Sequence, residues 1–257
     1  MWPFLNRVRH LQGLHTGEEC YIFGDGSSIK SFSLARFADR PGIAVGVMPR
    51  HVDFLNLDVR YWMLPEPMFF WPAFRRGPYA SREDRKLFQD FFRPRNMVPK
   101  SIKSFLNVTN FPTGLFHNVQ YVFDRFPGDH RFRESTHSVD WFAGSINASI
   151  SLAIYLGFTK AYLIGFDYTH EPATAGHWYE MGKGIPQTLE AYNVDFFSWA
   201  SRYIDIVTVT RERQSTRLNS IDYRTLTGEE LTYRENLDLL SRDEMTSLAV
   251  WPDYRIF

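Results

Sequence analysis

Residues 144–168 read GSINASISLAIYLGFTKAYLIGFDY, and this stretch decides the fold. Its first half repeats apolar side chains at a 3.6-residue period after Ser145, which can cap a helix, and Gly157 suits the helix end. Its second half is an apolar run, residues 161–166, that ends in Asp167. Because a buried strand directly follows an amphipathic helix, the stretch predicts part of a parallel sheet.

The same alternation of apolar strands and helices extends along the chain. It predicts a single α/β domain over residues 1–257, Rossmann-like, with a mostly parallel sheet covered by helices on both faces. Residues 66–138 are expected to form a less regular insertion, and residues after 211 a polar C-terminal extension. The expected strands are 20–23, 43–47, 59–64, 119–123, 161–166 and 204–209, and the expected helices include 82–92, 187–203 and 235–248.

The bulk composition is that of a folded, soluble protein. Of 257 residues, 44% are hydrophobic and 23% charged, and Lys+Arg and Asp+Glu both number 29. A nucleic-acid binder would need a basic excess, so this class is not indicated. The single cysteine, Cys20, excludes an internal disulfide and favours the cytoplasm. The short apolar N-terminus with basic residues after it leaves a peripheral contact with the inner membrane surface as a further possibility.

A glycine-rich turn, Gly-Asp-Gly-Ser-Ser at residues 24–28, follows the first apolar run. Gly24 and Gly26 allow a tight turn and let a ligand approach, because no Cβ stands in the way. The apolar pattern that follows indicates a short helix or turn, and a helix N-terminus there can bind phosphate. Plain turn chemistry explains the pattern about as well, and Ser27 and Ser28 can equally cap the helix.

Further polar residues follow the later strand. Asp167 can accept hydrogen bonds from sugar hydroxyls, or brace its loop through backbone N–H groups. In the next loop His177 can act as an acid or base, with Tyr179 able to stack on a ring; a structural hydrogen bond is the alternative role. Ser145 and Asn147 open the preceding helix and either cap it or hold an anion. Parallel strands end at one edge of a sheet, so we expect these groups to lie beside the glycine-rich turn.

Two other kinds of site are not indicated. The chain has no Cys pair, no H-E-x-x-H motif and no Asp-x-Asp motif, so no metal site is predicted. It also has no G-x-S-x-G elbow, which argues against a serine hydrolase of that type.

Three segments together resemble a bacterial glycosyltransferase-like group. Residues 17–29 (GEECYIFGDGSSI) resemble its opening, residues 144–167 its second and most specific signature, and His177–Gly184 a later segment. The group includes the family 42 sialyltransferases and the motility-associated flagellin-modifying proteins, and it borders the 6-hydroxymethylpterin pyrophosphokinase-like proteins. The resemblance covers roughly residues 13–210 and is weak between 66 and 138.

The resemblance implies a metal-independent transferase without a cofactor. It would move a sugar from a nucleotide-activated donor, CMP-linked in the sialyltransferases, to a glycan or protein acceptor. His177 would be the general base. Tyr168, beside the position of a tyrosine that helps the leaving phosphate, and Tyr179 complete the candidate catalytic set. The candidate nucleotide-binding residues are Gly24, Asp25, Gly26, Ser27, Ser28, Gly144, Ser145, Asn147, Gly165 and Asp167.

Some residues depart from the pattern of this group. Asp25 stands where the group has Asn, and an ionised carboxylate repels phosphate; Ser27 replaces Pro, and Met48 stands where Asn is usual. These departures favour an alternative, a non-catalytic nucleotide- or glycan-binding protein of the same fold in surface-polysaccharide biosynthesis. A pterin pyrophosphokinase would need Mg²⁺, for which no carboxylate cluster is seen. The aromatic run at residues 69–72 fits a core, an acceptor groove or a homo-oligomer interface equally well.

Overall fold

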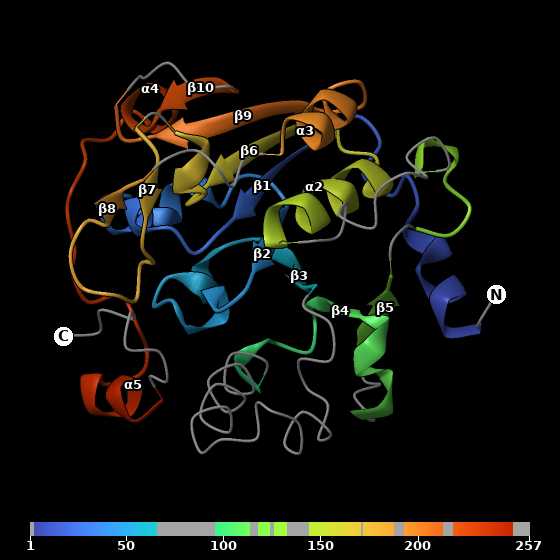
Figure 1. Ribbon diagram of the computed structural model, residues 1–257, viewed down its shortest axis with the longest axis horizontal. Coiled ribbons are helices and arrows are strands. Elements are labelled where there is room, and N and C mark those ends of the chain that lie inside the picture. The colour runs from blue at the N-terminus through green and yellow to red at the C-terminus, as the bar shows by residue number, and fades with distance from the viewer. Residues whose placement is uncertain are drawn as a thin grey trace.

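An eight-stranded parallel sheet forms the centre of the protein (Figure 1). The computed structural model describes residues 3–65, 96–113, 118–123, 126–132, 144–170, 172–187, 193–212 and 218–248. The sheet order is β10-β9-β6-β1-β2-β3-β4-β5, and each neighbouring pair is parallel. The predicted Rossmann-like α/β fold is therefore confirmed. The strands are β1 Glu19–Phe23, β2 Gly42–Val45, β3 Val59–Leu64, β4 Lys103–Asn107, β5 Val119–Val122, β6 Lys160–Ile164, β9 Asp205–Thr210 and β10 Asn219–Asp222.

The strand order reverses at β1. Strands β2 to β5 extend the sheet on one side of β1, whereas β6, β9 and β10 extend it on the other. Ile22 of β1 pairs with Ile43 of β2 and with Leu163 of β6. The loops after β1 and β6 therefore leave adjacent strands at a topological switch point, which is where ligands bind in open α/β sheets.

Both faces of the sheet are apolar and covered. On one face Ile22 and Leu163 belong to a core with α2 and α3, and α2 contacts β1, β2 and β3 (Figure 1). On the other face Phe23 and Ile164 pack with the 3-10 turns η2 and η3 and with α4. Burial on both faces is what a parallel sheet requires. The covering elements are α2 Ser145–Leu156, α3 Val194–Ala200, η2 Ser27–Ser31, η3 Leu34–Phe37 and α4 Tyr223–Thr227.

The two segments set apart in the sequence both add strands to the main sheet, of which β5 was expected as strand 119–123 whereas β4 and β10 were not. Residues 66–138, expected as a less regular insertion, contribute β4 and β5 to the main sheet. The polar residues after 211 contribute the edge strand β10 and helix α4. The helix predicted over 82–92 and the aromatic run at 69–72 lie outside the described residues, and the single-domain boundary stays a prediction.

Two predicted helices begin later than expected. Helix α3 starts at Val194 because Asn193 caps it, accepting the backbone N–H of Phe196 at 3.0 Å. Residues 235–240 are not helical, because their backbone pairs with a distant segment. Leu237 accepts from Val52 at 2.8 Å, and the helix of this region, α5 (Arg242–Leu248), comes only afterwards.

Candidate functional site

A pocket of about 330 Å³ opens where β1 and β6 end. Its walls come from the turn after β1, the loop after β6, the start of α2 and residues 174–177. The volume lies within the range of small-molecule sites, and the position is the switch point of the sheet. We call this cavity the switch-point pocket.

The turn after β1 and the loop after β6 are locked together by the carboxylate of Asp167. Ser28 donates its backbone N–H to Oδ2 at 2.8 Å and its hydroxyl to Oδ1, and the Ser27 hydroxyl donates to Oδ2 at 3.1 Å. All three residues are at most 3% exposed. The serine hydroxyls predicted to hold a nucleotide are therefore bonded inside the protein. Asp167 makes the bracing contacts that the sequence left as its alternative role.

The glycines of this turn are required by protein contacts. A Cβ on either Gly24 or Gly26 would lie 2.6 Å from the carbonyl oxygen of Gly165. Gly165 has φ 75°, and a Cβ there would lie 2.6 Å from the side chain of Ile29. Such distances are shorter than van der Waals contact. The sequence predicts that the missing Cβ atoms admit a ligand; in the structure they admit the backbone of the loop after β6.

Asp25 connects three loops around the pocket. Its Oδ2 accepts the backbone N–H of Val47, after β2, at 3.1 Å. Its Oδ1 accepts the indole N–H of Trp178, beside His177, at 3.2 Å. Burial raises the pKa of Asp25 to about 6, although His177 and both hydrogen bonds act in the opposite direction.

Helix α2 presents its N-terminus to the pocket. Gly144 occupies the N-cap position with φ 86°, and Ser145, expected to be the cap, is the first helical residue and lines the pocket. The N-terminus is the positive end of the helix dipole and suits a phosphate or carboxylate. Asn147, two residues further along the first turn, is buried and does not line the pocket.

His177 is paired with a carboxylate that the sequence analysis missed. Its Nδ1 lies 2.7 Å from Glu180 Oε1, and its backbone N–H donates to Oε2 at 3.2 Å. Burial lowers the pKa of His177, but the hydrogen bond to Glu180 and the charges of Glu180, Asp25 and Asp167 outweigh it, so the pKa is raised. A carboxylate at Nδ1 selects the neutral tautomer that carries its lone pair on Nε2, the form that can remove a proton. A Glu three residues after a His was the signal available in the sequence.

The two candidate catalytic tyrosines lie in different places. Tyr168 lines the switch-point pocket, and burial, with the charge of Asp167, raises its pKa, so its hydroxyl remains a donor. Tyr179 does not line this pocket. Its ring stacks on His177 with centroids 5.0 Å apart, and the Arg50 guanidinium lies 5.2 Å from its centroid. Tyr179 therefore packs against the face of the imidazole ring.

The predicted residues thus fall into two sets. Those that line the switch-point pocket are Asp25, Gly26, Ser145, Gly165, Asp167, Tyr168 and His177. Those that do not are Gly24, Ser27, Ser28, Gly144, Asn147 and Tyr179. The lining residues that the sequence analysis did not select are Val45, Phe166, Thr174, Ala175, Gly176 and Gln187. Met48, singled out in the sequence, is fully buried in the turn after β2.

Two kinds of feature are absent from the part of the chain that the structure describes. Within it, no three His, Cys, Asp or Glu residues gather in a group that could hold a metal ion. None of its helices is both long enough and apolar enough to cross a membrane.

Comparison with known proteins gives solved structures alone, since no family model and no curated protein matches the chain. The sialyltransferase CstII from Campylobacter jejuni, in complex with the substrate analogue cytidine-5'-monophosphate, matches over 90% of this chain and 97% of its own, with 11% identity and a TM-score of 0.48. The same enzyme with a trisaccharide acceptor and CMP matches over 90% and 100%, with 11% identity and a TM-score of 0.44.

A second solved protein is also similar. The MAf glycosyltransferase from Magnetospirillum magneticum AMB-1 matches over 95% of this chain and 41% of its own, with 14% identity and a TM-score of 0.47. CstII and MAf are of the sialyltransferase and motility-associated kinds that the sequence resembles. The pterin pyrophosphokinase-like part of the resemblance has no support among these structures.

Proposed function

We propose that this protein is a glycosyltransferase that moves a sugar from a nucleotide-activated donor to a glycan or protein hydroxyl. The observation that carries the proposal is the His177–Glu180 pair at the rim of a pocket that also receives the N-terminus of α2. The pair supplies a base, and the helix N-terminus supplies a positive dipole for a phosphate. The sequence resemblance adds a CMP-linked donor to this proposal.

The reaction is a direct displacement at the anomeric carbon of the donor. The acceptor oxygen forms a bond to that carbon while the bond from the carbon to the phosphate oxygen breaks. The acceptor proton passes to Nε2 of His177, and the departing nucleotide keeps the electron pair. The α2 N-terminus and the hydroxyl of Tyr168 stabilise the negative charge that develops on the phosphate. Every step uses groups of this chain and its two substrates.

The first experiment tests His177 as the base. Wild-type protein is titrated with CMP, UDP and GDP, and hydrolysis of the corresponding nucleotide sugars is then assayed with water as acceptor. His177→Ala should retain nucleotide binding and lose about 100-fold or more in turnover, the usual contribution of a general base. Unchanged turnover in this variant would remove the proposed mechanism.

The pH profile of the same assay tests Glu180. Activity requires neutral His177, so it should rise with pH through the raised pKa of that residue. Glu180→Gln removes the charge that raises this pKa, so the rise should occur at lower pH, with a lower plateau because the imidazole is a weaker base. A profile that keeps its midpoint would argue against the pair as the catalytic unit.

A second candidate function is a non-catalytic binding protein for a nucleotide or glycan in surface-polysaccharide biosynthesis. The observation in its favour is electrostatic. The described residues lining the switch-point pocket include the carboxylates of Asp25 and Asp167 but no Lys or Arg, and the hydroxyls of Ser27 and Ser28 are already bonded. Nucleotide binding without any hydrolysis or transfer would support this function over the first.

A further inference from the structure

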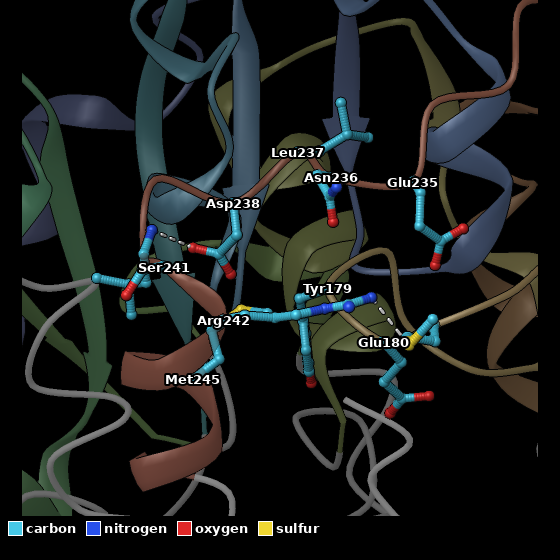
Figure 2. A pocket seen from close by; sticks show the side chains of 11 residues that line it. Tyr179, Glu180, Glu235, Asn236, Leu237, Asp238, Ser241, Arg242 and Met245 are labelled. Atoms are coloured by element: carbon cyan, nitrogen blue, oxygen red, sulfur yellow. Dashed lines mark hydrogen bonds between the residues drawn. The ribbon is translucent and has the colours of Figure 1, made fainter. Parts of the chain in front are cut away.

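A second pocket, of about 280 Å³, lies beside Tyr179 and Glu180 (Figure 2). One wall is formed by residues 179–181 and the other by residues 235–245 of the C-terminal segment. His177 lines the switch-point pocket, whereas Glu180, its hydrogen-bond partner, lines the second pocket. The His177–Glu180 turn therefore contributes a side chain to the lining of each cavity.

The carboxylates of the second pocket already have partners: Glu235 and Asp238 pair with cations, and Glu180 is hydrogen-bonded to the His177 imidazole. Each lining carboxylate has a partner that approaches from outside the cavity, and two of those partners are nearly inaccessible to water, Lys30 at 0% and Arg50 at 2%. The lining acids consequently contribute hydrogen-bond acceptors more than net negative charge. The pairs are Lys30–Glu235 at 2.9 Å, Arg50–Asp238 with Nε to Oδ2 at 3.1 Å, and His177–Glu180 at 2.7 Å.

Arg242 differs from Lys30 and Arg50, because it is exposed and its hydrogen-bond partner is not a carboxylate. It is an exposed residue, and its guanidinium donates to the sulfur of Met181 at 3.1 Å, a weak acceptor. Among the described residues, no carboxylate lies within ion-pair distance of Arg242. Arg242 is also the one arginine or lysine among the described residues that line this pocket. Because the Met181 sulfur takes only one of its N–H groups, the planar guanidinium of Arg242 retains donors for two parallel hydrogen bonds to a carboxylate or phosphate.

The place of Arg242 is fixed by the start of α5. Ser241 and Glu244 form a capping box: the serine hydroxyl donates to Glu244 Oε2 at 2.9 Å, and the backbone N–H of Glu244 donates back to that hydroxyl at 3.3 Å. Figure 2 shows Asn236 and Glu235 on the facing wall, with their side chains directed towards Arg242. The cavity thus combines one available cation with an amide and carboxylate oxygens.

We propose that the second pocket binds the acceptor, and that this acceptor is a sugar carrying a carboxylate or phosphate group. Arg242 holds the anionic group, and Asn236 and Glu235 bind the ring hydroxyls. The mixture of donors and acceptors suits a polyhydroxylated ligand, and the volume is near the lower limit of small-molecule sites. The acceptor assignment rests on the proposed function; the binding of an acidic sugar at Arg242 does not.

The experiment measures binding of three single sugars by calorimetry: glucose 6-phosphate, glucuronate and methyl glucoside. Wild-type protein should bind at least one anionic sugar about tenfold or more tighter than methyl glucoside, because charge-assisted hydrogen bonds are the stronger ones. The anion that binds tighter identifies phosphate or carboxylate as the natural group. Equal binding of all three sugars, or no binding of any, overturns the proposal.

Variants assign the effect to the residue. Arg242→Ala should abolish the preference for anionic sugars. Arg242→Lys should keep part of it, since lysine retains the charge but lacks the planar pair of N–H donors of a guanidinium. The matched control is Arg224→Ala, which removes an exposed arginine on α4 that lines neither pocket. If Arg242→Ala keeps the preference, the site is not this one and the proposal fails.

A parallel titration with CMP, UDP and GDP separates the two proposals. Nucleotide binding without anionic-sugar binding removes the second pocket as an acceptor site and leaves the proposed function standing. Anionic-sugar binding lost in Arg242→Ala, together with no binding of any nucleotide, confirms the pocket and removes the proposed function.

Discussion

Two glycine–serine segments look alike in the sequence and differ in the structure. The turn at residues 24–28 packs against the loop after β6, where its hydroxyls and one backbone N–H are bonded to Asp167. The segment at residues 144–147 opens α2, and a Cβ added to Gly144 would meet no atom within 4 Å. The first segment is therefore a joint between two strands, and the second presents a helix end to the pocket.

This difference shows that a glycine-rich turn at a sheet edge can serve protein packing as well as ligand binding. A missing Cβ permits close approach, but the sequence does not say whether a ligand or another part of the protein approaches. In residues 24–28 it is the neighbouring loop. In the proposed function it is α2 that binds the phosphate, because its twelve-residue length gives it a stronger helix dipole than the five-residue η2.

The largest effect should come from adding a methyl group to each segment. Gly26→Ala puts a Cβ 2.6 Å from the Gly165 carbonyl oxygen and 2.7 Å from Asp167, and should cost about 3 kcal/mol or more in unfolding free energy, as overpacking and a broken buried network do. Gly144→Ala meets open space and should cost less, about 1–2 kcal/mol, from its glycine-favouring backbone of φ 86° and ψ 150° alone. Urea denaturation of both variants measures this. Similar losses would remove the distinction between joint and open helix end.

A smaller effect should come from Asp25, the carboxylate within the first segment. Its pKa is about 6 in the folded protein and about 4 in an unfolded chain, so the folded state binds the proton more tightly. The resulting stability is fully present below pH ~4 and is lost as the pH rises through about 6, by roughly 2–3 kcal/mol. Asp25→Asn should lack this loss in urea denaturation at several pH values, whereas the exposed Asp195→Asn should follow wild type.

The smallest effects should come from the serines. Ser28→Ala removes a buried hydrogen bond to a carboxylate and should cost about 1–2 kcal/mol of stability. Ser145→Ala should change stability by no more than about 0.5 kcal/mol while weakening CMP binding several-fold. Denaturation and calorimetry on the same pair of variants measure both quantities. A Ser28 variant that is as stable as wild type would show that the joint does not depend on this bond.

The sequence predicted the parts of the fold that depend on local pattern. The apolar period after Ser145, the glycine at the end of α2 and the apolar run that becomes β6 are all readable within residues 144–168, and the structure has them. Residues 235–240 could not be read in this way. Their extended shape depends on backbone bonds to Val52 and Arg50, more than 180 positions away, which no window of sequence contains.

The site was predictable in part for the same reason. Residues that follow a strand were expected at one edge, and Asp25, Ser145, Asp167 and His177 do line one pocket. The bonding of Asp167 to Ser28 was not readable, because it follows from β1 and β6 being neighbours although 139 positions separate the two residues. Glu180 was within reach, since a carboxylate three positions after a histidine can meet it in a turn.

The buried ammonium of Lys30 has a consequence for how the protein is made. It contacts the carbonyl oxygens of Glu180 and Gly182 and the carboxylate of Glu235, and it is 0% exposed. On the ribosome, residue 30 emerges long before residue 235. Until Glu235 has been made, the Lys30 ammonium lacks its carboxylate partner, and burying an unpaired ammonium is strongly unfavourable. The contacts that hold the His177 turn are therefore complete only after residue 235 has been made, whereas every strand of the main sheet precedes that residue.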